Sequence, residues 1–119
     1  MKDLLALDDI TVLEIADHRG EMLGKLLSSM GAEVIKIEPI AGSPSRRIGP
    51  FYQDIPNRDR SLHFWHYNQG KQGVTLNLET HDGRALLKSL APKVQVLIET
   101  NRPGYMDELG LSFDALRTI

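Results

Sequence analysis

The sequence predicts an α/β domain built on a parallel sheet, and three consecutive segments carry this prediction. Residues 11–16 are short, apolar and rich in β-favouring side chains, which is typical of a strand. Apolar residues then recur at helical spacing between Met22 and Met30. A second strand-like run, residues 34–37, follows them. Such a β-α-β unit has parallel strands and a right-handed crossover, so we expect a Rossmann-like sheet with flanking helices.

Glycine and proline mark the ends of these first elements. Gly31 stands where the C-terminus of a helix favours a left-handed residue. Pro39 bounds the second strand. The β-α-β unit is therefore expected to span residues 11–37.

Residues 39–61 are expected to form a long loop. Glycines and prolines exclude regular structure over most of it: Pro39, Gly42, Pro44, Gly49, Pro50 and Pro56. The loop is also basic, with Arg46, Arg47, Arg58 and Arg60 against Asp54 and Asp59. A loop of this length in a small domain is usually either functional or disordered. Because Phe51 and Tyr52 give it aromatic surface for packing, we favour a functional or interface role.

The second half of the chain continues the alternation of helices and strands. Ser61, Thr80 and Ser112 each precede a helical pattern and can cap it. The expected elements are a helix over residues 62–67, a strand over 74–78, a helix around Leu86, Leu87 and Leu90 that ends at Pro92, a strand over 94–98, a turn of helix up to Leu109 and a last helix from Phe113.

The composition is that of an ordinary globular domain, with 41% hydrophobic and 25% charged residues. The net charge of -2 argues against a nucleic-acid partner. The absence of cysteine removes disulfides, thiolate nucleophiles and thiolate metal sites. No apolar run approaches the roughly 18 residues of a membrane span, and acidic residues interrupt residues 1–9, unlike a signal peptide. We therefore expect a cytoplasmic protein without a membrane partner.

Residues 114–119 form a helical run that is followed by no capping glycine or polar tail. The last carbonyl groups of such a helix lack partners. We therefore expect residues 1–119 to be a single, partial domain of a longer protein. A short helix that frays at the terminus is the alternative.

The turn after the first strand does not match a dinucleotide site. Such a site needs Gly-x-Gly-x-x-Gly, whereas residues 16–24 have only Gly20 and Gly24, at another spacing, so NAD binding is rejected. Asp17 and His18 are neighbours and would point to opposite faces of an extended segment, which makes them a poor acid/base pair. His18 is either a plain loop histidine or a group beside an anion at the helix N-terminus.

His63 and His66 have the i, i+3 spacing of one helical face. A metal pair and aromatic packing are the two interpretations. Aromatic residues surround both histidines and no third ligand is evident, so we favour packing and expect no metal.

Two short motifs suit a phosphorylated ligand. Residues 68–71, Asn-Gln-Gly-Lys, form a glycine-containing turn that ends in a lysine, and the alternative is a solvated turn. Residues 99–104, Glu-Thr-Asn-Arg-Pro-Gly, follow a strand, where open α/β sheets bind ligands. There Arg102 can bind an anion, and Asn101 can read a base or an amide. The predicted site is a strand-end crevice lined by Arg46, Arg47, Lys71 and Arg102.

A larger, ordered set of motifs resembles the N-terminal region of the family III CoA-transferases. In chain order the motifs are Val12-Leu-Glu-Ile, Gly31-Ala-Glu-Val-Ile-Lys-Ile-Glu-Pro, Ser45-Arg-Arg-Ile-Gly-Pro, Asn68-Gln-Gly-Lys, Val74-Thr-Leu-Asn-Leu, Asp82-Gly-Arg, Val96-Leu-Ile-Glu-Thr-Asn-Arg-Pro-Gly and Leu109-Gly-Leu. The resemblance runs across nearly the whole chain.

The resemblance implies a Rossmann-like CoA-binding region within a larger fold whose two subunits interlock. It implies acyl-CoA and carboxylic acid substrates, and a homodimer or other self-association. His18 and Gly20 would lie near the thioester end of coenzyme A. Lys71, Thr100, Asn101 and Arg102 would hold its nucleotide and pyrophosphate.

The family's nucleophile is an aspartate, which the resemblance places beyond Ile119. We therefore expect this chain to bind coenzyme A without catalysing transfer by itself, because the covalent route needs that carboxylate. Two alternatives stay open at this point. One is part of an α-methylacyl-CoA racemase-like enzyme, and the other is a non-catalytic binding or assembly module.

Overall fold

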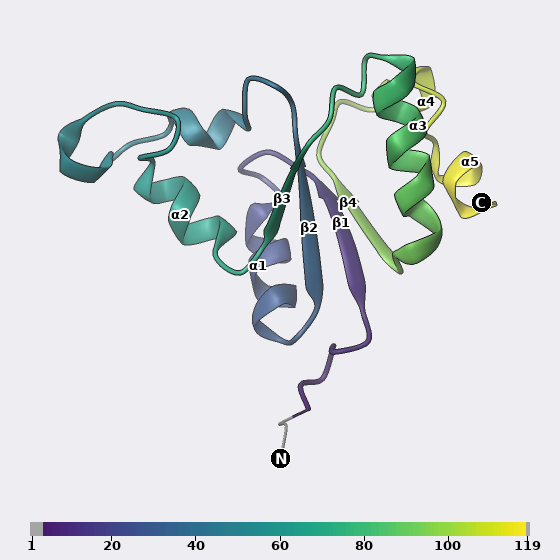
Figure 1. Cartoon of the computed structure of the whole chain (residues 1–119), viewed down its shortest axis with the longest axis horizontal. Helices are drawn as coiled ribbons and strands as arrows, with labels where there is room; N and C mark the ends of the chain where they lie inside the picture. Colours follow the sequence, from purple (N-terminus) through teal and green to yellow (C-terminus); the bar gives the residue numbers. More distant parts are fainter. Residues whose placement is uncertain (1–3, 119) are drawn as a thin grey trace.

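The computed structural model describes residues 4–118, and a four-stranded parallel sheet forms its centre (Figure 1). The strands are β1 (Thr11–Ile15), β2 (Glu33–Glu38), β3 (Gln72–Thr75) and β4 (Val96–Glu99). Their order is β3-β2-β1-β4, and each adjacent pair is parallel. This order is that of the first four strands of a Rossmann sheet, which confirms the predicted fold class.

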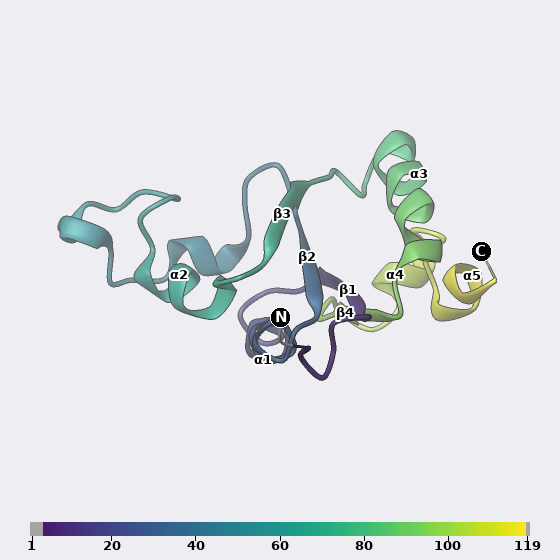
Figure 2. The same cartoon turned by 60° about the horizontal axis from the view of Figure 1, so that its bottom comes forward.

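Helices cover both faces of the sheet (Figure 2). The helical segments are α1 (Glu21–Ser29), η1 (Pro44–Arg47), η2 (Tyr52–Asp54), α2 (Leu62–Asn68), α3 (His81–Leu90), η3 (Ala91–Lys93), α4 (Tyr105–Glu108) and α5 (Phe113–Arg117). Helix α1 lies on one face, while α3, α4 and α5 lie on the other. The predicted β-α-β unit is confirmed by the parallel pairing of β1 with β2.

The predicted helix boundaries have the expected local chemistry. The hydroxyl groups of Ser61, Thr80 and Ser112 accept hydrogen bonds from the third backbone N–H that follows each of them, at 3.0 to 3.1 Å. Gly31 has a φ of 107°, in the left-handed region that ends a helix. The three predicted caps and the terminating glycine are therefore confirmed. Residues 1–3, which belong to the segment compared with a signal peptide, and Ile119, which ends the last predicted helix, lie outside the described residues.

The second pair of strands is shifted from the prediction. We expected strands over residues 74–78 and 94–98, whereas β3 and β4 are Gln72–Thr75 and Val96–Glu99. Asn77 explains the early end of β3, because its side chain accepts a hydrogen bond from the Glu79 N–H and its carbonyl oxygen accepts one from Thr80. A local turn of this kind competes with strand pairing.

The alternation of side chains along β1 divides the core into two parts. Val12 packs on the α1 face with Ala16, Ala32, Val34 and Ile98. Leu13 packs on the opposite face with Ile37, Leu87, Met106 and Leu111. Each face of the sheet therefore has a core of its own.

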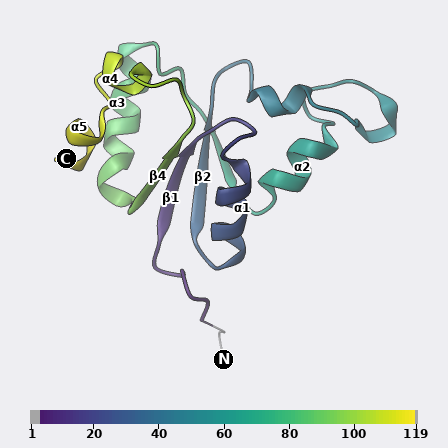
Figure 3. The ribbon, with the colours of Figure 1, turned by 180° about the vertical axis from the view of Figure 1, so that it is seen from behind.

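Residues 39–61 extend away from the sheet as an arm, and the following helix α2 returns the chain to the sheet (Figure 3). The arm is held together by a bridge between Phe51 and Ser61 and by the Arg46 guanidinium, 3.8 Å from the centre of the Phe64 ring. Two short 3-10 turns lie within it. Its functional role stays a prediction.

The aromatic packing that we favoured for His63 and His66 is confirmed. Both rings lie against Tyr67, with centroid distances of 4.7 Å and 4.8 Å. Lys25 of α1 also contacts His66, with 3.2 Å between its Nζ and the ring Nε2. This small cluster joins α2 to α1.

The outer side of α1 is apolar and exposed. Met22, Leu23, Leu26 and Met30 each keep 46 to 48% of their surface accessible. Such a stripe is typical of a surface that another protein segment covers. Within residues 4–118, no helix has the length and apolar character needed to cross a membrane.

Candidate ligand-binding site

A pocket of about 500 Å³ opens where β1 and β4 end at their carboxyl sides. Here the chain order reverses, because β2 and β3 lie on one side of β1 and β4 lies on the other. Open α/β sheets bind their ligands at this switch point. The turn after β1, the turn after β2, the Asn77 turn and the loop after β4 supply the polar walls: Asp17, Arg19, Ser43, Asn77, Glu79, Thr100, Asn101 and Arg102.

Asp17, Arg19 and Thr100 tie the β1 turn to the β4 loop at the rim of this pocket. The Asp17 carboxylate accepts hydrogen bonds from Arg19 Nε and Nη2 at 2.8 to 3.1 Å. Thr100 Oγ1 donates to Asp17 Oδ1 at 3.0 Å and accepts from the Asp17 N–H at 2.9 Å. Arg19 Nη2 also donates to the Thr100 carbonyl oxygen at 2.8 Å. Two turns that are distant in sequence are thus held in one arrangement.

These contacts keep Asp17 ionised. The hydrogen bonds from Arg19 lower the pKa of the Asp17 carboxyl well below its ordinary value, and they outweigh the opposing effect of burial. The negative charge of Asp17 in turn balances Arg19. Arg19 therefore presents a positioned set of N–H donors at the rim rather than a free positive charge.

Three of the predicted site residues line this pocket: Thr100, Asn101 and Arg102. Arg102 is exposed and pairs with Glu108 at 2.7 Å, so its charge is also balanced. Asn101 Nδ2 is covered and has no acceptor within residues 4–118. A ligand can reach this amide only if the loop shifts.

Arg46 holds the wall formed by the η1 turn. Its Nε and Nη2 donate to the two oxygens of Glu38 at 2.6 and 2.7 Å, and Glu38 also accepts from the Ser43 N–H at 2.8 Å. Burial opposes ionisation of Glu38, but these donors prevail and lower its pKa to about 2. Arg46 thus positions the turn through Glu38, and it is not among the residues that line the pocket.

Lys71 lies in a buried cluster of four charged side chains on the α1 face. Its Nζ is 2.8 Å from Glu14 Oε1, and only 2% of its side chain is exposed. Lys36, which pairs with Glu14 across β1 and β2, lies 2.8 Å from Glu14 Oε2 and 3.1 Å from Glu21 Oε2. Asn68 joins the cluster by donating to Glu21 and accepting from Lys71, both at 2.9 Å.

The predicted crevice lined by Arg46, Arg47, Lys71 and Arg102 is therefore wrong. Lys71 precedes β3 and Arg102 follows β4, and these strands form opposite edges of the sheet. The Lys71 ammonium also points beneath α1, where carboxylates replace the solvent around it. Burial lowers its pKa, and the nearby Glu14 carboxylate opposes that shift. The turn over residues 68–71 is a structural clamp in this arrangement, neither a solvated turn nor an open phosphate site.

Glycines at two positions allow α1 to lie close to the sheet, and Gly24 is the one that faces the charged cluster. A Cβ atom on Gly24 would collide with Glu14 Oε1 and would lie 3.0 Å from the Lys71 Cε. A Cβ atom on Gly20 would lie 2.8 Å from the Thr100 methyl group and 2.9 Å from the Ala16 Cβ. Gly20 is therefore needed for close packing of α1 against the sheet. This packing accounts for the glycine without the ligand-binding role that was predicted for it.

The remaining predicted residues, His18 and Arg47, are exposed and do not line the pocket. His18 lies between Asp17 and Arg19, which do line it. Sequence reasoning missed Arg19 and Ser43. A usable signal existed for both, since each belongs to a turn that directly follows a strand at the carboxyl edge.

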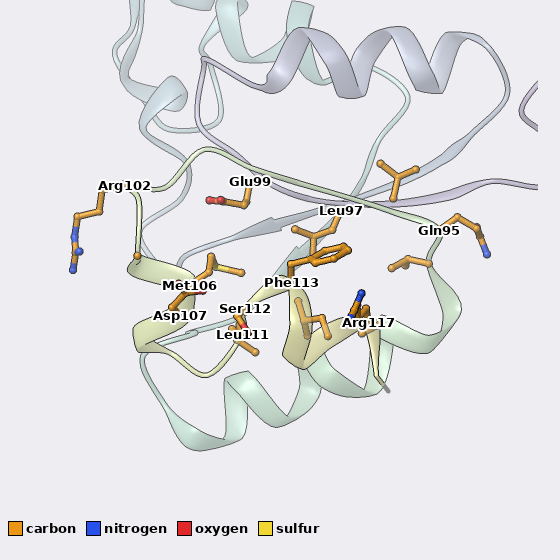
Figure 4. A pocket seen from close by; sticks show the side chains of 15 residues that line it. Gln95, Leu97, Glu99, Arg102, Met106, Asp107, Leu111, Ser112, Phe113 and Arg117 are labelled. Carbon is orange, nitrogen blue, oxygen red and sulfur yellow. The ribbon is translucent and has the colours of Figure 1, made fainter.

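A second pocket of about 500 Å³ lies between the free edge of β4 and helices α4 and α5 (Figure 4). Phe113 lies against Leu97 at its centre, with Met106 and Leu111 beside them and Arg102 pointing away. The nearby Arg117 pairs with Asp114 at 3.2 Å. The walls of this second pocket are mostly apolar, so it suits hydrophobic groups better than phosphates.

No group of three or more His, Cys, Asp or Glu side chains within residues 4–118 is arranged to hold a metal ion.

The family profile of CoA-transferase family III matches residues 7–119. The chain belongs to this family. The match confirms the resemblance that the ordered motifs indicated, and it covers every strand and helix described above.

Two similar proteins are named as CoA-transferases or as a subunit of one. The chain is 38% identical over 111 residues to the succinyl-CoA:(R)-benzylsuccinate CoA-transferase subunit BbsE of Thauera aromatica, covering 91% of this chain and 27% of that protein. It is also 38% identical over 115 residues to the succinyl-CoA–D-citramalate CoA-transferase of Chloroflexus aurantiacus, covering 95% of this chain and 28% of the relative.

Solved structures of longer proteins contain the same fold. The crystal structure of the hypothetical protein Rv3272 from Mycobacterium tuberculosis superposes with a TM-score of 0.85 and 35% identity, covering 98% of this chain and 31% of that one. A CAIB/BAIF family protein from Brucella suis gives a TM-score of 0.84 at 31% identity, with the same coverage. The chain thus spans between a quarter and a third of the length of these relatives.

Proposed function

We propose that this chain is the CoA-binding portion of an acyl-CoA:carboxylate CoA-transferase. The observation that carries the proposal is the pocket at the switch point of the sheet. Its rim is built from the turn after β1 and the loop after β4, two of the three segments to which the family resemblance assigns CoA contacts; the third, the turn that ends in Lys71, does not line it. The names of two relatives, a succinyl-CoA:(R)-benzylsuccinate CoA-transferase subunit and a succinyl-CoA–D-citramalate CoA-transferase, support the same substrate class.

The balanced charges of the rim shape the expected binding. Arg19 is paired with Asp17 and Arg102 is paired with Glu108, so a phosphate must share donors that already serve carboxylates. We expect saturable binding of coenzyme A that weakens as salt is added, because exposed ion pairs are screened. Isothermal titration calorimetry of coenzyme A into the chain, at low and high salt, measures both properties.

Two arginines of equal exposure make a matched test of the site. Arg102 and Arg117 each keep 62% of their side chain exposed and each pair with one carboxylate, but only Arg102 lines the strand-end pocket. We expect Arg102→Gln to weaken coenzyme A binding and Arg117→Gln to leave it unchanged. Equal effects of the two variants, or no binding by the unaltered chain, would overturn the proposal.

We further propose that the chain alone does not transfer CoA, because the resemblance places the reactive aspartate outside it. The assay is exchange of CoA between succinyl-CoA and a carboxylic acid. Turnover above the blank contradicts this part of the proposal.

Self-association is also proposed, and the exposed stripe of Met22, Leu23, Leu26 and Met30 supports it. Size-exclusion chromatography with light scattering tests it, and a monomer at high concentration contradicts it.

A further inference from the structure

Glu14, Glu21, Lys36 and Lys71 form a buried cluster of four charged side chains on the α1 face. Both carboxylates have no exposed surface, and the two lysine side chains are 2% exposed. Removing four charges from water is costly, and apolar side chains of similar volume are often no less stable.

We propose that this cluster sets the position of the η1 turn, which forms one wall of the strand-end pocket, and that Glu21 and Lys71 are positioning residues for the ligand bound there. The proposal rests on the proposed function, because it concerns the same pocket. Neither side chain lines the pocket. Their effect on the ligand is transmitted by the turn.

Ser45 is the link between the cluster and the turn. Its hydroxyl group donates to Glu21 Oε2 at 2.7 Å, and the residue is fully buried within η1. Ser43 and Pro44, which immediately precede it, line the pocket. The Ser45 carbonyl oxygen also accepts a hydrogen bond from the Ser61 hydroxyl at 3.2 Å, which connects the turn to the start of α2.

Lys71 keeps Glu21 in place from the other side. Its Nζ donates to the Glu21 carbonyl oxygen at 3.0 Å and to Asn68 Oδ1 at 2.9 Å, and the Asn68 amide in turn donates to Glu21 Oε2. Two hydrogen-bond donors, Ser45 and Asn68, and the Lys36 ammonium group at 3.1 Å therefore converge on one oxygen of Glu21. Such convergence fixes the carboxylate, because each donor restricts the direction of the others.

The balance of charges within the cluster is part of how it holds the turn. The cluster holds two carboxylates and two ammonium groups, so loss of Lys71 leaves one buried negative charge uncompensated. The second substitution Glu14→Gln removes that excess and keeps the Lys36–Glu21 pair. If positioning depends on a balanced cluster, the double variant recovers part of what Lys71→Met loses.

The experiment compares four variants with the unaltered chain: Ser45→Ala, Lys71→Met, Lys71→Met/Glu14→Gln and Ser112→Ala. Ser112→Ala is the control, because it removes the cap of α5 and does not touch the strand-end pocket or the cluster. Each variant is first shown to be folded by near-UV circular dichroism. Hydrogen exchange of residues 42–48 and calorimetric binding of coenzyme A are then measured at one temperature.

We expect Ser45→Ala and Lys71→Met to speed exchange of residues 42–48 and to weaken coenzyme A binding by about tenfold, which corresponds to about 1.4 kcal/mol. The double variant should recover slower exchange and tighter binding, and Ser112→Ala should change neither. A general loss of stability would instead speed exchange throughout each variant, in α3 as well as in residues 42–48.

The two readouts separate failure of this inference from failure of the proposed function. Unchanged exchange of residues 42–48 in both Ser45→Ala and Lys71→Met overturns the positioning role, whatever the binding shows. Faster exchange with unchanged coenzyme A affinity overturns the link to the ligand. If the unaltered chain does not bind coenzyme A, the proposed function fails and the link to that ligand fails with it, while exchange still decides whether the cluster positions the turn.

Discussion

The two faces of the sheet are stabilised by different means, although the same four strands build both. On the face covered by α3, α4 and α5, Leu13, Leu87 and Leu111 are no more than 1% exposed and pack with other apolar side chains. On the α1 face, a smaller apolar cluster lies beside the buried charges of Glu14 and Lys36.

This difference shows what each face contributes. Apolar packing is non-directional and supplies free energy in proportion to buried area. Hydrogen-bonded charges are directional and supply little net free energy, yet they fix the positions of the groups that they join. The α3 face thus holds the fold together, while the α1 face aligns α1, α2 and η1 with the strand ends.

Lys71→Met tests the charged face and should have the largest effect. It leaves an uncompensated buried charge, which typically costs about 3–5 kcal/mol of unfolding free energy. Urea denaturation followed by circular dichroism measures this loss. The added substitution Glu14→Gln should return a substantial part of it, and a double variant no more stable than the single one would contradict the charge-balance argument.

Leu87→Ala tests the apolar face. Leu87 is fully buried within the α3-side cluster, so truncation should cost about 2–4 kcal/mol through lost burial and a residual cavity. Because this face is apolar, no second substitution there should restore the lost unfolding free energy in the way that Glu14→Gln restores charge balance. Leu86→Ala is the control, because Leu86 is 55% exposed and its truncation should cost far less.

Acid should weaken the folded state through Glu38 on the charged face, in addition to Asp17, whose pKa is also lowered. The pKa of Glu38 falls from an ordinary 4.5 to about 2 in the folded protein, so the ionised form is stabilised by folding. Its contribution is complete above about pH 4.5 and is lost as the pH falls toward 2, amounting to about 2–3 kcal/mol. Denaturation across this range measures it, and Glu38→Gln should flatten the dependence. An unchanged pH profile in that variant would count against the assignment.

Gly24→Ala tests the contact between α1 and the charged cluster, because its local and tertiary effects on stability have opposite signs. Alanine is favoured over glycine within a helix by about 1 kcal/mol. At this position, however, the new methyl group would displace the Glu14 carboxylate, so we expect a net loss of about 1–2 kcal/mol, in line with overpacking. A thermal melt decides the sign, and a stabilised variant would show that the cluster can relax without cost.

Much of the fold was accessible from local sequence patterns. Apolar periodicity located the β-α-β unit, and Ser61, Thr80 and Ser112 located helix starts, because a cap depends on residues within one turn of itself. The ordered motifs also indicated the family. The ends of β3 and β4 were displaced by a few residues, since the Asn77 turn decides where pairing stops.

The chain by itself determined which residues are charged, which are apolar and where strands and turns fall. The destination of each charge was decided only by the tertiary structure. Lys71 and Arg102 both follow glycine- or asparagine-containing turn motifs, yet one is buried against Glu14 and the other is exposed beside Glu108. The order β3-β2-β1-β4 places the strands next to Lys71 and Arg102 at opposite edges of the sheet. The alternation of side chains along β1 places Glu14 beneath α1. The Lys71–Glu14 pair joins residues that are distant in sequence, so no local pattern contains it, whereas Arg102 and Glu108 are only six residues apart.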